Sequence, residues 1–123
     1  MNEPWPTELR LRDGGRTLAI VFDDGARFDL TAEYLRVTSP SAEVQGHSPA
    51  ERKTVPGKRD VTIISATPVG NYAVRLGFDD MHDTGIYSWT YLRTLGAERA
   101  ARWAGYLDEL AAKGLTREPP ARR

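Results

Sequence analysis

Residues 61–78, Val-Thr-Ile-Ile-Ser-Ala-Thr-Pro-Val-Gly-Asn-Tyr-Ala-Val-Arg-Leu-Gly-Phe, decide the fold of this chain. The stretch from Val61 to Val69 is rich in β-branched residues, which favour strands, and Gly70-Asn71 is a turn signal. From Tyr72 to Phe78, large apolar residues alternate with small or charged ones. This period of two is typical of a strand with one buried face, so the stretch predicts a β hairpin.

The residues upstream of the hairpin predict a second β unit. Three runs of alternating apolar and polar residues are separated by the turn signals Asp13-Gly14-Gly15 and Asp24-Gly25: 8–12, 18–22 and 28–30. We expect them to form a three-stranded antiparallel meander. Thr31 then suits the N-cap of a short helix over 32–36.

The downstream part of the chain is helical in pattern. Ser88 suits the N-cap of one helix, and Gly96 is placed to end it. Residues 97–113 carry apolar side chains at helical spacing, and Gly114 would stop this longer helix. The predicted fold class is therefore α+β, an antiparallel β meander plus a β hairpin packed with a short helix and a longer C-terminal helix.

The domain boundaries follow from the same patterns. We expect an N-terminal tail over 1–6, one domain over 7–115 and a disordered C-terminal tail over 116–123. The apolar pattern collapses between residues 38 and 58, which predicts a long connecting loop.

Composition excludes several classes of function. The 123 residues hold 17 basic and 17 acidic side chains, so no net charge recruits nucleic acid or an anionic membrane. No cysteine is present, which removes disulfides, thiolate metal sites and cysteine nucleophiles. The N-terminus lacks the pattern of a signal peptide, and no apolar run approaches the roughly 20 residues of a membrane span. The expected location is the cytoplasm.

Several blocks of sequence resemble a known family. They are Tyr34-Leu35-Arg36, residues 39–47 (SPSAEVQGH), residues 68–76 (PVGNYAVRL), Phe78-Asp79-Asp80, residues 82–89 (HDTGIYSW) and Tyr91-Leu92. Over about residues 7–115 the chain resembles the domain of unknown function 971 family, bacterial stand-alone relatives of the N-terminal domain of γ-butyrobetaine hydroxylases. The resemblance implies neither the separate jelly-roll oxygenase domain of those enzymes nor its chemistry.

The resemblance also implies a zinc site that this chain has lost. In the hydroxylases three cysteines and a histidine hold a structural zinc, and these positions correspond here to Ser39, Ser41, Val44 and His82. Zinc prefers thiolate and imidazole ligands, so the three replacements should abolish binding. We therefore expect no cofactor, with a weak divalent cation as the alternative.

Two groups of residues are candidates for a functional site. The metal candidates share one short polar connection: Asp79, Asp80, His82 and Asp83. The contact candidates lie in the long loop: Ser39, Ser41, Glu43, Gln45 and His47. For the first group the alternative is a solvated turn, and for the second it is an irregular loop that satisfies its own backbone.

No constellation of catalytic residues is recognisable. Only two histidines exist, and neither begins the His-x-acid pattern of non-haem iron oxygenases. No Gly-x-Ser-x-Gly elbow accompanies the serines. The aromatic residues of 72–103 fall at core spacing rather than on a stacking platform, so nucleic acid is not an expected partner.

The sequence therefore favours a non-catalytic protein-interaction or adaptor module. Similar domains occur fused to P-loop iron–sulfur carriers, so the resemblance implies an accessory role in iron–sulfur or metalloprotein handling. Two alternatives stay open, a metal-binding domain built on His82 and a small-molecule-binding protein or enzyme. A protein partner is expected, and the resemblance to the hydroxylases is compatible with a homodimer.

Overall fold

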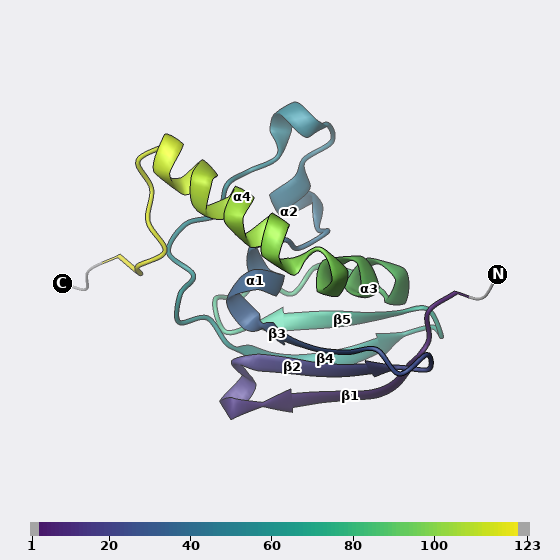
Figure 1. The fold of residues 1–123 in the computed structure, drawn as a ribbon. Helices are drawn as coiled ribbons and strands as arrows, with labels where there is room; N and C mark the ends of the chain where they lie inside the picture. The colour runs from purple at the N-terminus through teal and green to yellow at the C-terminus, as the bar shows by residue number, and fades with distance from the viewer. Residues whose placement is uncertain (1–2, 121–123) are drawn as a thin grey trace.

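Two antiparallel sheets and a layer of helices make up the computed structural model, which describes residues 3–120. Each sheet has three strands, in the orders β1-β2-β3 and β4-β5-β6. The helices lie together on one side of the strands, as Figure 1 shows. The predicted α+β class is confirmed. No helix in this described part is long and apolar enough to cross a membrane.

The first sheet is the predicted meander. It contains β1 (Pro6–Arg12), β2 (Thr17–Phe22) and β3 (Arg27–Thr31). The register places Leu11, Leu18 and Leu30 in one row across the sheet. Because side chains alternate between the faces of a strand, this row lies on the face that the sheet turns towards the core, where Leu18 and Leu30 are fully buried.

The second sheet has one strand more than the predicted hairpin. It contains β4 (Ile63–Val69), β5 (Ala73–Phe78) and β6 (Gly85–Ser88). Strand β6 pairs Tyr87 with Val74 of β5, and the sequence analysis did not predict this third strand. A strand of four residues offers too few positions to show a period of two.

Two helices begin at the N-cap residues that the sequence predicted. Helix α1 (Ala32–Val37) begins where the Thr31 hydroxyl accepts the backbone N–H of Tyr34, at 3.1 Å. Helix α3 (Trp89–Ala97) is capped in the same way by Ser88 and is followed directly by α4 (Arg99–Ala112). A short helix, α2 (Ala42–Gln45), lies inside the connecting segment that the sequence predicted as a loop.

Gly96 does not end α3, contrary to the sequence prediction. It lies inside the helix, and a Cβ atom there would stand 2.6 Å from the ring of Phe28. The glycine is therefore needed for the close approach of α3 to the first sheet rather than as a helix stop.

One apolar core joins both sheets to the helices. Residues from β2, β3, β5, α1 and α3 form a continuous buried cluster. Two tyrosine hydroxyls are satisfied within it by carbonyl groups of neighbouring helices: Tyr34 donates to Leu95 at 2.7 Å, and Tyr87 donates to Leu35. A second small cluster packs Tyr106 and Leu110 of α4 against Val37 and Val55, which holds the connecting segment to α4.

Residues near both ends of the chain form backbone hydrogen bonds that the sequence did not predict. Strand β1 already begins at Pro6, and the carbonyl of Trp5 accepts the N–H of Asp23 at 2.8 Å. At the other end, the carbonyls of Thr116 and Arg117 accept the N–H groups of Gly57 and Arg59. Residues 1–2 and 121–123 of the two predicted tails lie outside the described residues.

Replacing Gly96 by alanine should destabilise the protein by about 1–3 kcal/mol, because the added methyl group collides with Phe28. The matched control is Gly105→Ala in α4, where nothing lies within 4 Å. That change should stabilise the protein by about 0.5–1 kcal/mol through helix propensity alone. Urea unfolding of both variants measures the difference, and equal stabilisation by the two would contradict the packing described here.

Candidate functional site

Four polar or charged residues among the described ones are buried: Glu33, Ser39, Ser41 and His82. Three of them, Ser39, Ser41 and His82, belong to one cluster between the connecting segment and the β5–β6 connection. A buried polar group without a partner costs free energy, so such a cluster marks a place where the fold has been built around specific hydrogen bonds.

A tight turn after β5 presents His82 to the cluster. The N–H of Phe78 donates to the His82 carbonyl at 2.9 Å, and the N–H of His82 donates to the Asp80 carboxylate at 3.1 Å. Met81 takes a positive φ of 73° to close this turn. The imidazole then lies over the end of β5, 6.0 Å from the Phe78 ring between centroids.

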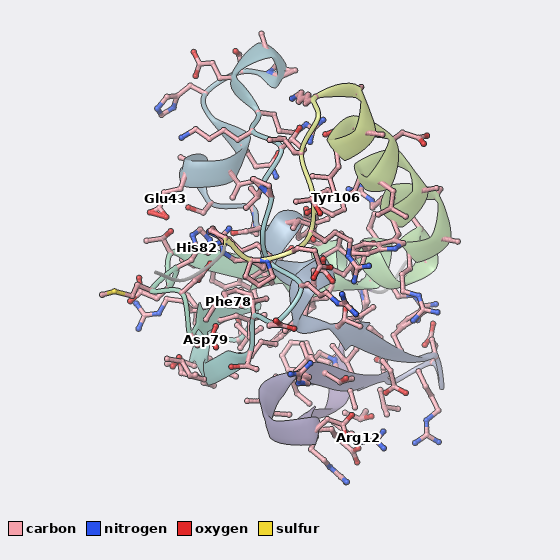
Figure 2. All side chains as sticks on the ribbon, turned by 90° about the vertical axis from the view of Figure 1, so that its left-hand side faces the viewer. Arg12, Glu43, Phe78, Asp79, His82 and Tyr106 are labelled. Carbon is pink, nitrogen blue, oxygen red and sulfur yellow. The ribbon has the colours of Figure 1, made fainter. Side chains whose placement is uncertain are left out.

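Both ring nitrogens of His82 are engaged. Nδ1 lies 2.9 Å from Oε1 of Glu43, and Nε2 lies 2.8 Å from Oγ of Ser39. A carboxylate only accepts hydrogen bonds, so the network assigns the proton to Nδ1 and leaves Nε2 to accept from the Ser39 hydroxyl. Figure 2 shows Glu43 above the His82 ring, on the side of α2.

The serines extend the network into α2. Oγ of Ser39 accepts the N–H of Ser41 at 3.2 Å, and Oγ of Ser41 accepts the N–H of Glu43 as the N-cap of α2. The Ser41 hydroxyl also lies 2.7 Å from that of Thr84, and the Gln45 amide donates to the Ser39 carbonyl at 2.8 Å. The cluster thus joins the end of α1, the start of α2 and the β5–β6 connection.

A charged group flanks the cluster. Asp80 pairs with Arg36 at 2.8 Å and with Lys58 at 2.7 Å. Burial raises the pKa of the Asp80 carboxyl, but the hydrogen bonds from Lys58 and Arg36 outweigh it and hold the pKa at about 2. The carboxyl is therefore ionised at all ordinary pH values.

The environment keeps His82 neutral at neutral pH. Burial lowers the pKa of the imidazole below its usual value, and the charge of Arg36 lowers it further. The Glu43 carboxylate opposes this shift without reversing it. A neutral ring is the form that the hydrogen-bond network requires.

The four predicted metal candidates do not converge. Asp79 bonds to the N–H and hydroxyl of Thr62, Asp80 is held by Arg36 and Lys58, and Asp83 is exposed. Figure 2 shows Asp79 on the far side of Phe78 from His82. Between residues 3 and 120, no group of three or more His, Cys, Asp or Glu side chains is arranged to hold a metal ion.

The residues at the expected zinc positions do not fit zinc. The structure brings Ser39, Ser41 and His82 together, as the resemblance implied. Serine hydroxyls are poor zinc ligands, Val44 is apolar and almost fully buried, and both nitrogens of His82 are already used.

The predicted contact residues divide into internal and surface groups. Ser39 and Ser41 are buried and Gln45 is half-buried against the Ser39 carbonyl, whereas Glu43 and His47 are exposed. The sequence placed Glu43 in the right loop, but its pairing with His82, and the part played by Thr84, were missed. Their partners lie about 40 residues away in the chain, and no local pattern reports such a contact.

The order Ser39–His82–Glu43 has the connectivity of a serine hydrolase triad. Its serine is completely buried, however, and its Oγ already takes the N–H of Ser41. In this arrangement that oxygen is not open to solvent, and the three residues link the segments that carry them.

Comparison with known proteins identifies similar chains. The family described as gamma-butyrobetaine hydroxylase-like, N-terminal, matches residues 9–93. Two proteins solved by NMR in solution are similar over nearly their whole length. One has a TM-score of 0.84 at 40% identity, with 98% of this chain and 95% of that one covered. The other has a TM-score of 0.82 at 47% identity, with 99% and 91% covered.

A crystal structure is also similar, that of a protein of unknown function from Acidithiobacillus ferrooxidans ATCC 23270, which belongs to the DUF971 family. Its TM-score is 0.62 at 41% identity, with 76% of this chain and 93% of that chain covered. No curated protein matches.

Acid should weaken the fold through His82. The unfolded ring takes up a proton near pH 6.5 and the folded ring only at lower pH, so stability is complete above about 6.5 and falls below it, by at most about 1.4 kcal/mol per pH unit. Urea unfolding between pH 7.5 and 5 measures the slope. His82→Asn should lower stability at pH 7.5 yet flatten the slope, and His47→Asn, at an exposed ring, is the matched control. An unchanged slope in His82→Asn would remove His82 as the cause.

Zinc should not bind to the natural cluster. Protein purified without a histidine tag should hold less than about a tenth of an equivalent of zinc and show no thermal shift when zinc is added. The triple variant S39C/S41C/V44C restores three thiolates beside His82 and should take up about one equivalent. Elemental analysis of both proteins decides the matter, and stoichiometric zinc in the natural protein would contradict the fit described above.

Proposed function

This chain belongs to the gamma-butyrobetaine hydroxylase-like, N-terminal family, and from that premise we propose that it is a non-catalytic protein-interaction module. The observation that supports this most is the internal closure of the Ser39–His82–Glu43 network. Its polar groups satisfy one another, so they serve to position a surface rather than to perform chemistry.

The surface that the network positions is the lobe, which we define as residues 42–53. It contains α2 and a 3-10 turn at Pro49–Glu51, and it projects from the helical layer at the top of Figure 1. Every residue from 47 to 53 is exposed. A run of exposed residues on a fixed backbone is a common way for a scaffold to present binding groups.

Hydrogen bonds within the lobe hold this backbone. The N–H of Lys53 donates to the Val44 carbonyl at 2.7 Å, and the N–H of His47 donates to the Glu51 carboxylate at 2.8 Å. Gly46 has a φ of 66°, and a Cβ atom there would stand 2.4 Å from the Glu51 side chain. The turn therefore closes tightly on itself.

Contacts with α4 hold the lobe from the other side. Glu109 accepts from Arg52 at 2.6 Å and from Thr54 at 2.9 Å. The Tyr106 hydroxyl donates to the Val55 carbonyl at 2.6 Å. A surface ordered in advance loses little conformational entropy on binding, which favours recognition of a partner by a polar surface.

The setting we propose is iron–sulfur or metalloprotein handling in the cytoplasm. The support is an implication of the resemblance, namely that similar domains occur fused to P-loop iron–sulfur carriers. In this setting the chain supplies contacts, and the metal chemistry belongs to its partner.

A partner captured through the lobe tests the proposal. The double variant H47A/K53A removes two exposed side chains, and Arg27→Ala, at an exposed position of β3, is the matched control. We expect native protein to recover a partner from extract, H47A/K53A to lose it by at least about tenfold, and Arg27→Ala to retain it. Quantitative mass spectrometry of the captured material measures the ratio. Recovery of no partner above background, or equal recovery by H47A/K53A, would refute the proposal.

A further inference from the structure

Glu33 is the buried charged residue that the cluster around His82 does not use. Its side chain is 7% exposed, at the start of α1. Arg117 binds the carboxylate with two parallel hydrogen bonds, Nε to Oε2 at 2.7 Å and Nη2 to Oε1 at 2.7 Å. This fork-to-fork geometry is the arrangement by which a carboxylate recognises a guanidinium group rather than a simple cation.

An aromatic wall completes the surroundings of the guanidinium. The Cζ atom of Arg117 lies 5.2 Å from the centroid of the Trp103 ring. Tyr34 packs edge-on against that ring at 6.4 Å, which fixes its orientation. An acid at one side and an indole face at the other are the two groups that recognise arginine in proteins.

Besides the contacts of Arg117, two backbone hydrogen bonds and one exposed ion pair hold the segment that carries this residue. We call residues 116–120 the strap. It leaves α4 after Gly114, which has a φ of 66°, and it runs beside the residues that precede β4 (Figure 1). Two backbone hydrogen bonds hold it to Gly57 and Arg59, at 2.9 and 3.0 Å. The further ion pair, Arg59 to Glu118, is more than half exposed at both side chains and contributes little.

The strap is therefore held by one half-buried arginine and two backbone hydrogen bonds, and it bends at residues 117–118. Backbone groups pair with a segment of any sequence, so those two bonds carry no preference for this particular sequence. The preference for arginine comes from Glu33 and Trp103 alone.

We infer that Glu33 and Trp103 form an arginine-binding site, which Arg117 fills within the chain and which an arginine-bearing segment of a partner protein fills when Arg117 is displaced. The inference rests on the proposed function in that it names the chemistry of a partner. The site itself is separate from the lobe.

Exchange of one arginine for another is favoured over a simple release of the strap. Loss of Arg117 alone would leave a buried carboxylate without its partner, which is strongly unfavourable. An incoming guanidinium restores both hydrogen bonds as it enters. A segment without arginine therefore cannot replace the strap. The strap competes with an incoming segment at an effective concentration that is set by its short connection to α4.

The experiment uses the full-length Arg117→Ala protein, in which the strap keeps its backbone hydrogen bonds to Gly57 and Arg59 and only the guanidinium beside Glu33 and Trp103 is removed, so the probe tests the arginine site alone. The probe is the blocked peptide Thr-Arg-Glu-Pro-Pro, the sequence of residues 116–120, and the control peptide carries lysine in place of arginine. Binding is followed by NMR through the indole N–H resonance of Trp103, which Trp103→Phe assigns.

We expect a saturable shift at roughly millimolar peptide, the range against which a short tether competes. The lysine peptide should bind at least about tenfold more weakly, because it cannot form the paired hydrogen bonds. The natural protein should show no saturable shift at the same concentrations, and R117A/E33Q should show none either.

Absence of a saturable shift in folded Arg117→Ala would overturn the inference, and so would equal binding of the two peptides or unchanged binding in R117A/E33Q. If Arg117→Ala fails to fold, Arg117→Lys keeps the positive charge beside Glu33 and is tested by the same criteria. Failure here together with lobe-dependent capture of a partner would refute only the arginine site. Peptide binding without any captured partner would refute only the function proposed for the lobe.

Discussion

The imidazole of His82 is shielded from solvent, so its two nitrogens must find hydrogen-bond partners inside the protein. Ser39 and Glu43 supply them, from a segment about 40 residues earlier in the chain. Ser39 follows the end of α1, and Glu43 lies in the first turn of α2. The two hydrogen bonds to His82 therefore fix the position of the connecting segment. Where the segment is fixed, the lobe beyond it is fixed as well.

The same requirement shows what joins segments that are distant in the chain. Here a chain of hydrogen bonds from His82 through Ser39 and Ser41 to Thr84 joins the same segments. Each of these hydrogen bonds contributes only about 1 kcal/mol net. The apolar packing of Val44 and the contacts of Glu109 therefore also stabilise the position of the connecting segment.

Much of the fold could be predicted because its signals are local. The alternation around Val74 and Leu76, the turn at Gly70-Asn71 and the caps at Thr31 and Ser88 all depend on neighbouring residues, and all are confirmed. Strand β6 was missed because it is stabilised by pairing with β5 rather than by its own pattern. Gly96 was misassigned because its reason, the Phe28 ring, comes from another element. For the candidate site, the sequence named residues of the two segments 39–47 and 79–83, but the pairings of Glu43 with His82 and of Glu33 with Arg117 depend on tertiary structure alone.

The central claim is that hydrogen bonds to His82 hold the lobe in place, and native-state hydrogen exchange of Ser39→Ala tests it most directly. That change removes the partner of Nε2 and of the Ser41 N–H and breaks no hydrogen bond between the strands. The account predicts that the lobe amides of Gly46 and Lys53, which donate to Ala42 and Val44, exchange at least about tenfold faster, while those of Val74 and Leu76 in β5 keep their protection. Unchanged exchange in the lobe, or equal acceleration throughout the protein, would contradict it.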